Sequence, residues 1–237
     1  MTAQLGSSRF WIAFVAVLLL LPLAACGGDD DDDDDEDEKE ATPVDGTFVG
    51  KLSETDAFVA VVAAPRAEGQ DRRRVTVFVC DGRRLCELFR GESTGNTFSA
   101  GSEDDDAEAK GELSAEEAKG TIEVGDDEPI RYQAAQATAT SGLYDLTVSR
   151  NGRIRGASEA GVALRGSSTL PSPGTGRLRL ADGTRLRFDI ATGSADANLG
   201  LRPGQLRLIV LPDRKLAGAG MNRGNGADSV YFVRASK

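Results

Sequence analysis

The chain has 237 residues, with 38 acidic and 28 basic side chains and no histidine. Without histidine, serine–histidine and cysteine–histidine catalysis are excluded, and the most common protein ligand of transition metals is missing. Residues 1–40 hold 11 of the acidic side chains, so residues 41–237 are nearly neutral. Within that part, residues 41–141 carry 20 acidic and 11 basic side chains, and residues 142–237 carry 7 and 15. This uneven charge predicts that the two halves face each other or present different surfaces to partners.

An apolar segment runs from Phe10 to Leu23 and ends in the tetrad Leu23-Ala24-Ala25-Cys26. Its fourteen residues are too few to cross a bilayer as a helix, which needs about 20, so residues 1–25 are predicted to be a signal peptide. The tetrad resembles the lipobox of bacterial lipoproteins. This resemblance implies that Cys26 is lipidated and begins the mature chain on the extracytoplasmic face of the cell membrane. The alternative is an ordinary signal peptide that a cysteine happens to follow.

A strongly acidic run follows the cysteine, with 11 carboxylates and one lysine between residues 29 and 40. Such a composition cannot bury apolar surface, and its charges repel one another, so residues 26–43 are expected to be a disordered tether. Anionic lipid would repel this tether over about a Debye length, which holds the folded part away from the membrane. A calcium loop is the alternative, but it needs spaced ligands around a turning glycine, and the run lacks that spacing.

From Thr47 onward, short runs rich in apolar residues alternate with glycine, aspartate or proline turns every eight to twelve residues. This spacing predicts an all-β fold of antiparallel strands. We expect two β subdomains, at 44–140 and 141–237, or one continuous β domain over 44–237, forming a barrel or a sandwich.

An internal repeat is suggested by matched spacings. Gly120 and Tyr132 lie twelve residues apart, as do Gly176 and Phe188. The pair Gly142-Leu143 matches Gly200-Leu201, and Val148 to Gly156 spans the same eight residues as Val210 to Gly218. The repeat predicts an antiparallel meander of three or four strands that is used twice.

Two hairpins can be predicted in detail. If Asp81 to Leu85 form a turn, Cys80 and Cys86 lie directly opposite each other, where a disulfide fits; two free buried thiols or, less favoured, a metal-binding pair are the alternatives. Around Asp182-Gly183, a three-residue loop at 182–184 keeps apolar residues on one face. That loop pairs Leu180 with Leu186, Leu178 with Phe188, Arg179 with Arg187 and Arg177 with Asp189.

Several stretches resemble a β domain that recurs in exported and lipid-anchored proteins of high-GC Gram-positive bacteria. They are residues 57–62 (AFVAVV), 77–82 (VFVCDG), 88–91 (LFRG) and 142–144 (GLY). The resemblance covers residues 46–156 and implies an extracytoplasmic location and a β fold. That family is essentially uncharacterised, so the resemblance brings no catalytic residue.

The residues that carry chemistry are few. Asp126, Asp127 and Glu128 are the candidates for carboxylate catalysis, although an acidic turn before Pro129 is the preferred interpretation. Arginines alternate with apolar residues in two later segments, which predicts a basic stripe on one face that could hold an anionic envelope polymer or a lipid headgroup. The stripe consists of Arg177, Arg179, Arg185, Arg187 and Arg207. A solvated outer face is the alternative.

These observations predict an exported, lipid-anchored, all-β binding or interaction module without enzymatic activity. We expect no cofactor, no metal and no nucleic-acid partner. Polysaccharide binding by stacking is disfavoured, because the only tryptophan, Trp11, lies in the signal peptide. A lipid or small-ligand carrier with an internal barrel cavity is the second interpretation. A carboxylate-dependent hydrolase is the third.

Overall fold

The computed structural model describes residues 44–103, 106–148, 154–158, 163–164, 174–180, 182–192, 199–221 and 230–236. The regular elements among them are all β-strands, and the strands pair antiparallel, which confirms the predicted fold class. No helix within these residues could span a membrane. The predicted signal peptide, Cys26 and the acidic tether lie outside the described residues.

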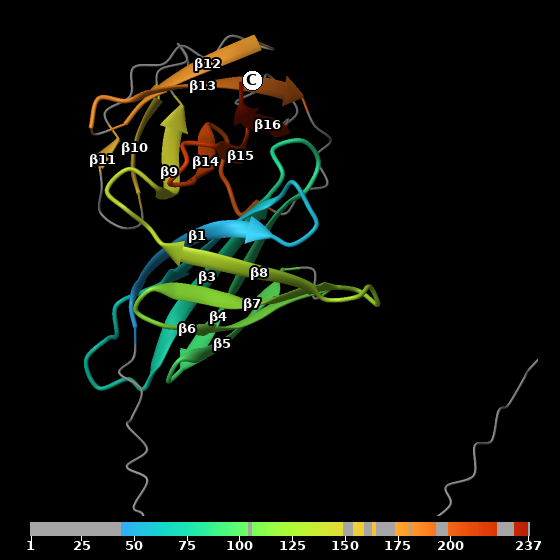
Figure 1. The fold of residues 1–237 in the computed structure, drawn as a ribbon, viewed down its shortest axis with the longest axis vertical. Coiled ribbons are helices and arrows are strands. Elements are labelled where there is room, and N and C mark those ends of the chain that lie inside the picture. The colour runs from blue at the N-terminus through green and yellow to red at the C-terminus, as the bar shows by residue number, and fades with distance from the viewer. Residues whose placement is uncertain are drawn as a thin grey trace, which may run out of the picture. The chain divides into compact units, whose positions relative to one another are not determined.

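The first eight strands form a closed antiparallel barrel. They are β1 (Gly46–Leu52), β2 (Phe58–Ala63), β3 (Arg72–Cys80), β4 (Cys86–Thr94), β5 (Thr97–Ser102), β6 (Ala107–Leu113), β7 (Glu117–Val124) and β8 (Ile130–Gln136). Each strand pairs with the next along the chain, and β1 also pairs with β8, so the barrel has no free edge (Figure 1). Short turns favour this meander, because they bring sequential strands into direct antiparallel contact.

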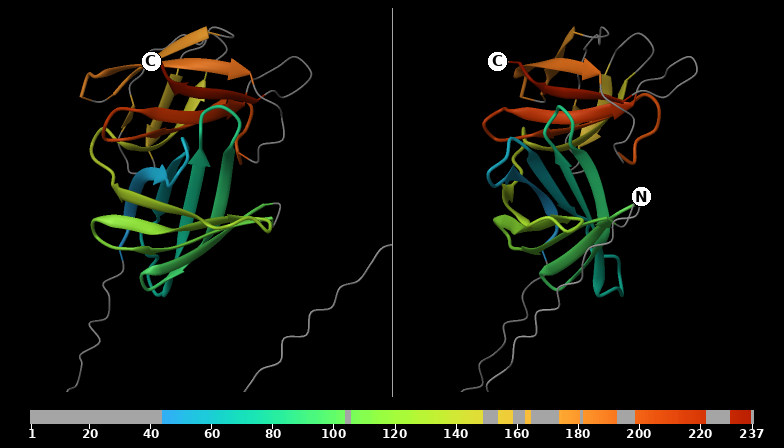
Figure 2. Two further views of the ribbon diagram at one scale, coloured as in Figure 1. Left: turned by 45° about the vertical axis from the view of Figure 1, so that its right-hand side comes forward. Right: turned by 90° about the vertical axis from the view of Figure 1, so that its right-hand side faces the viewer.

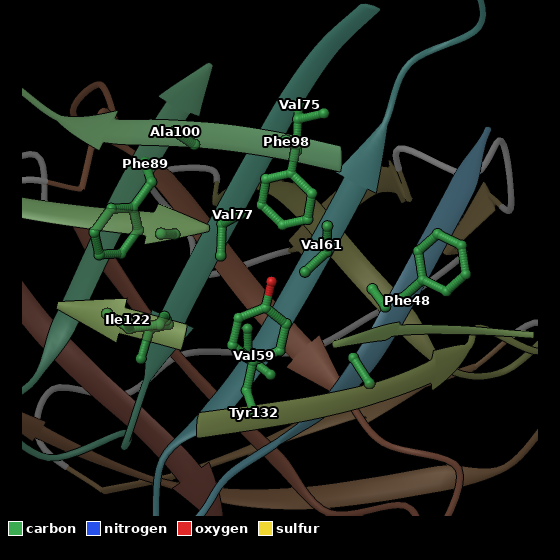
Figure 3. Packing of buried hydrophobic residues seen from close by; sticks show 14 of the residues in the cluster. Phe48, Val59, Val61, Val75, Val77, Phe89, Phe98, Ala100, Ile122 and Tyr132 are labelled. Carbon is green, nitrogen blue, oxygen red and sulfur yellow. The ribbon is translucent and has the colours of Figure 1, made fainter. Parts of the chain in front are cut away.

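The barrel interior is filled with side chains. Valines of β2 and β3 pack there with the rings of Phe48, Phe89, Phe98 and Tyr132, each at most 5% exposed (Figure 3). The alternation along each strand explains this core, because every second side chain points inward. Eight strands enclose an interior just wide enough for such side chains, and each fully buried valine or phenylalanine contributes about 1.5 to 3 kcal/mol.

The remaining strands form a second antiparallel sheet. They are β9 (Gly142–Val148), β10 (Ile154–Ser158), β11 (Ala163–Leu164), β12 (Gly174–Arg179), β13 (Arg185–Thr192), β14 (Gln205–Val210), β15 (Leu216–Met221) and β16 (Val230–Ala235). The order across the sheet is β11-β10-β9-β14-β15-β16-β13-β12. Figure 2 shows β12 and β13 as neighbours at one end of it. One face of the sheet buries its own apolar core around Tyr144, Leu208 and Phe188.

The opposite face of the second sheet packs against the outside of the barrel. Phe58, Phe78 and Leu88 of the barrel share one buried apolar cluster with Ile209 and Phe232 of the second sheet. Residues Lys39–Lys237 accordingly form one compact unit. The barrel strands therefore have apolar side chains on both faces where the second sheet covers them, which explains the nearly continuous apolar run of β2.

The matched spacings of the suggested repeat correspond to similar cross-strand residue pairs in the two segments. Tyr132 lies directly opposite Gly120, and Phe188 lies directly opposite Gly176. The ring of Phe188 covers its glycine so closely that a Cβ atom there would lie 2.1 Å from the ring. The hairpins of β9–β10 and β14–β15 also share a register. The two matched segments are placed differently, however, because β7 and β8 belong to the barrel and β12 and β13 to the second sheet.

The first predicted hairpin is present. Cys80 and Cys86 lie opposite each other at the ends of β3 and β4, with their Cα atoms 4.1 Å apart, and form a disulfide. The turn is organised by Asp81, whose Oδ1 accepts hydrogen bonds from the backbone N–H groups of the three residues Arg83, Arg84 and Leu85 at 2.7 to 3.0 Å. The disulfide excludes the two alternatives, free buried thiols and a metal-binding cysteine pair.

The second hairpin has a different register from the predicted one. Leu178 pairs with Leu186 and Arg177 with Arg187, instead of Leu178 with Phe188 and Arg177 with Asp189. The backbone N–H of Leu180 donates to the carbonyl oxygen of Thr184 at 2.8 Å, so the loop closes one residue earlier than predicted. A shift of two residues leaves every side chain on its original face, and the apolar pattern alone therefore could not exclude it.

Candidate functional site

Four of the five predicted arginines lie together on the outer face of the β12–β13 hairpin. Arg177 lies directly opposite Arg187, and Arg179 lies directly opposite Arg185. All four side chains are exposed, while the leucines and Phe188 between them are buried on the other face. We call this group of four the arginine face. Strict alternation of apolar and charged residues along both strands produces it.

Among the residues that the structure describes, few acids lie beside the arginine face on the β12–β13 hairpin. Within the described part of the chain, none of its four guanidinium groups forms an ion pair. Asp189 lies two residues beyond Arg187 on the same strand, but it is opposite Thr175 and accepts a hydrogen bond from the hydroxyl of Ser236 at 2.7 Å. Like charges directly opposite on paired strands are destabilising. Among the described residues, the arginine face is therefore a local concentration of positive charge.

Asp182, in the loop of the same hairpin, is engaged locally. Its carboxylate accepts hydrogen bonds from the backbone N–H and the hydroxyl of Thr184, both at 2.8 Å. These bonds hold the pKa of Asp182 below its usual value. The carboxylate thus stabilises the loop that joins the two strands carrying the arginines.

Arg207 does not belong to the arginine face, which corrects the predicted stripe. Strands β15 and β16 separate β14 from β13, and Arg207 is only 7% exposed. Its Nε and Nη2 donate to the two carboxylate oxygens of Asp145 on β9, at 2.6 and 2.7 Å. Its guanidinium also lies 5.6 Å from the centre of the Phe78 ring in the barrel. Arg207 is buried because the barrel covers this part of the outer face.

Asp145 is an ion-pair partner of Arg207 that the sequence analysis missed. It lies 62 residues before Arg207, and the two are neighbours only because β9 pairs with β14. The signal in the sequence was a single acid in an otherwise apolar strand, GLYDLTV. A pattern of that kind predicts a buried ion pair but does not identify the partner.

The acidic candidates for catalysis do not form a cleft. Asp126, Asp127 and Glu128 are exposed in the turn between β7 and β8, as the preferred interpretation expected. The backbone N–H of Asp127 donates to the carbonyl oxygen of Val124 at 3.2 Å, which is typical of a tight turn. Among the described residues, no group of three or more acids and cysteines could hold a metal ion.

Comparisons of the chain with models of protein families and with curated proteins give no match.

Proposed function

We propose that the protein is a lipid-anchored, non-enzymatic binding module of the cell envelope that holds an anionic ligand on its arginine face. The location is supported by the apolar leader and by the tetrad that ends at Cys26. The Cys80–Cys86 disulfide is also typical of proteins that fold outside the cytoplasm.

The proposal rests on two pairs of directly opposed arginines, Arg177 with Arg187 and Arg179 with Arg185. A solvated outer face would be as soluble with lysine and glutamate placed opposite each other, and that choice avoids the cost of facing like charges. Guanidinium groups instead suit phosphate and carboxylate, which they bind with two parallel hydrogen bonds. The ligand class is therefore an anion with several charged groups, such as an acidic polymer or a cluster of lipid headgroups.

The internal-carrier interpretation has less support. A carrier needs inward positions that leave space, but the barrel interior holds four aromatic rings packed against valines (Figure 3). Enzymatic activity likewise finds no support in the exposed acidic turn around Asp127. Binding at the surface is the function that the described geometry favours.

The binding test uses the full chain, produced in a host that exports it and extracted in mild detergent. The probes are polyphosphate and vesicles with and without anionic phospholipid. We expect the variant Arg177→Gln/Arg187→Gln to bind the preferred probe at least about tenfold more weakly, because two charge-assisted contacts are lost. The control Arg74→Gln/Arg84→Gln removes the same charge from the exposed surface of the barrel and should bind like the wild type.

The two probes distinguish a polymer from a membrane surface as the source of the anion. Equal loss in the arginine-face variant and in the control would show that net charge alone drives binding, which would contradict the proposed site. The anchor is tested separately: mass spectrometry of the mature protein should find an acylated Cys26 as its first residue. A mature chain that lacks the acyl mass would contradict the lipid anchor.

A further inference from the structure

The outside of the barrel carries a shallow, open groove of about 840 Å³ that crosses five neighbouring strands, β4 to β8. Its walls are two rows of polar side chains that follow the strand register. The first row is Glu92, Ser99, Lys110, Thr121 and Arg131, and the second is Thr94, Thr97, Glu112 and Lys119. With about 4.8 Å between neighbouring strands, the groove is roughly 19 Å long. Sequence patterns give no sign of it, because it depends on how the strands are arranged side by side.

The floor of the groove is the backbone of the row between the two walls, and it is held firmly. Gly111 and Gly120 lie opposite each other there, with the side chain of Tyr132 beneath them inside the barrel. The Tyr132 hydroxyl donates to the carbonyl oxygen of Lys110 at 3.3 Å. A Cβ atom on Gly120 would lie 1.9 Å from that same carbonyl oxygen. The two glycines therefore allow a close backbone packing that larger residues would prevent.

The charges along the walls are largely neutralised within the protein. Lys110 pairs with Glu108 at 2.7 Å and with Glu123 at 3.7 Å. Lys119 pairs with Glu112 at 3.5 Å, and Glu92 pairs with Arg72 at 3.3 Å. The groove thus differs from the arginine face, because it presents alternating donors and acceptors with little net charge. A strongly charged polymer would gain little from it.

The groove also lacks what a bound peptide would use. Its apolar lining side chains, Phe98 and Tyr132, are only 5% and 3% exposed, so they offer no pocket for an apolar anchor. The closed barrel has no free strand edge with which an extended peptide could pair. What remains are hydroxyls, carboxylates and ammonium groups at the surface. These groups suit a ligand that is rich in hydroxyls, each of which both donates and accepts a hydrogen bond.

We infer that the groove over β4 to β8 is a second binding site, distinct from the arginine face, for an extended neutral glycan chain. Recognition is by hydrogen bonds from the two polar walls, not by stacking on aromatic rings. This mode of binding is weak for each sugar and gains strength with chain length, because successive residues contact successive strands of the groove. The site would let the protein hold a neutral glycan and an anionic ligand at the same time.

The test is a nuclear magnetic resonance titration of the isotope-labelled full chain with cellohexaose, chitohexaose and maltohexaose. Each probe is added to about 10 mM, where a ligand with a Kd of about 1 mM is close to saturating. We expect at least one probe to shift amide signals of β4 to β8. The variant Ser99→Trp, which fills the groove from an exposed position, should weaken that binding at least tenfold. The matched variant Arg177→Gln/Arg187→Gln should leave it unchanged.

Three outcomes would overturn the inference. The first is the absence of shifts at the groove with all three probes. The second is glycan binding that Ser99→Trp leaves intact. The third is that a neutral Ser/Gly-rich peptide of similar length shifts the groove signals more strongly than any glycan. Failure of the arginine-face experiment would not affect this result, since the two sites share no residue.

Discussion

Removing one partner of the ion pair between Arg207 and Asp145 should cost more stability than removing the other. Its two partners differ in exposure, because the arginine side chain is 9% exposed and the carboxylate side chain 39%. Removal of Asp145 therefore leaves a buried cation, whose remaining neighbours are the Leu199 carbonyl oxygen at 3.4 Å and the face of Phe78. Removal of Arg207 leaves a carboxylate that water can reach. The first change should cost more stability than the second.

The magnitude follows from the burial of each partner. Loss of one partner of a fully buried ion pair costs about 3 to 5 kcal/mol. We expect about 3 kcal/mol for Asp145→Ala, since the pair is partly hydrated from the side of the carboxylate. For Arg207→Met we expect about 1 to 2 kcal/mol, because the carboxylate regains water and the methionine retains apolar contact. At about 2 to 4 °C per kcal/mol, Asp145→Ala should lower Tm by roughly 6 to 12 °C.

Urea unfolding of the full chain, followed by circular dichroism, measures both single variants and the double variant. The double variant should be more stable than Asp145→Ala alone, because the uncompensated cation is then absent. The reasoning would be refuted if Arg207→Met were as destabilising as Asp145→Ala, or if the two costs simply added.

Three further predictions concern other parts of the fold. Burial raises the pKa of all three tyrosines, that of Tyr144 to about 12. The stability that the neutral tyrosines contribute should be complete below the unfolded pKa of 10.0 and should be lost as pH rises toward 12. An ultraviolet titration that shows tyrosinate near pH 10 in the folded protein would contradict this. Replacing Cys80 and Cys86 by serine should cost about 2 kcal/mol in urea unfolding, the entropy of a six-residue loop, and an unchanged midpoint would refute it. Gly120→Ala should cost about 3 kcal/mol of stability or prevent folding. The control Gly101→Ala, where a Cβ atom meets nothing within 4 Å, should change stability by no more than about 0.5 kcal/mol. Equal effects of the two variants in thermal unfolding would contradict the close backbone packing at Gly120.

The strands and the disulfide hairpin could be predicted because their signals are local. Alternation of buried and exposed residues shows within the six residues of β12 and the eight of β13, and the Cys80-to-Cys86 turn is equally local. The register of the β12–β13 hairpin was wrong by two residues, because the apolar pattern repeats with exactly that period. Local patterns therefore predict which face of a strand is buried more securely than they predict which residues pair across neighbouring strands.

The features that the sequence missed or left open depend on contacts between distant segments. The closure of the barrel joins β1 to β8, and nothing within either strand specifies the other as its neighbour. Arg207 has the same alternation as Arg177, yet it is buried, because β14 lies under the barrel and β12 does not. The groove over β4 to β8 likewise arises from five strands together. The sequence could identify the arginines but could not say which of them the fold would leave exposed.

The apolar face shared by the barrel and the second sheet sets a limit on how this chain can be divided. A barrel expressed alone would expose one contiguous apolar surface formed by Val49, Phe58, Phe78 and Leu88. The second sheet alone would expose Leu143, Ile209 and Phe232. Surfaces of this kind drive self-association of soluble proteins. During folding, whichever half forms first must wait for the other with that surface exposed to water. Each half therefore covers the apolar surface of the other, and a truncation near residue 140 should yield two fragments that aggregate.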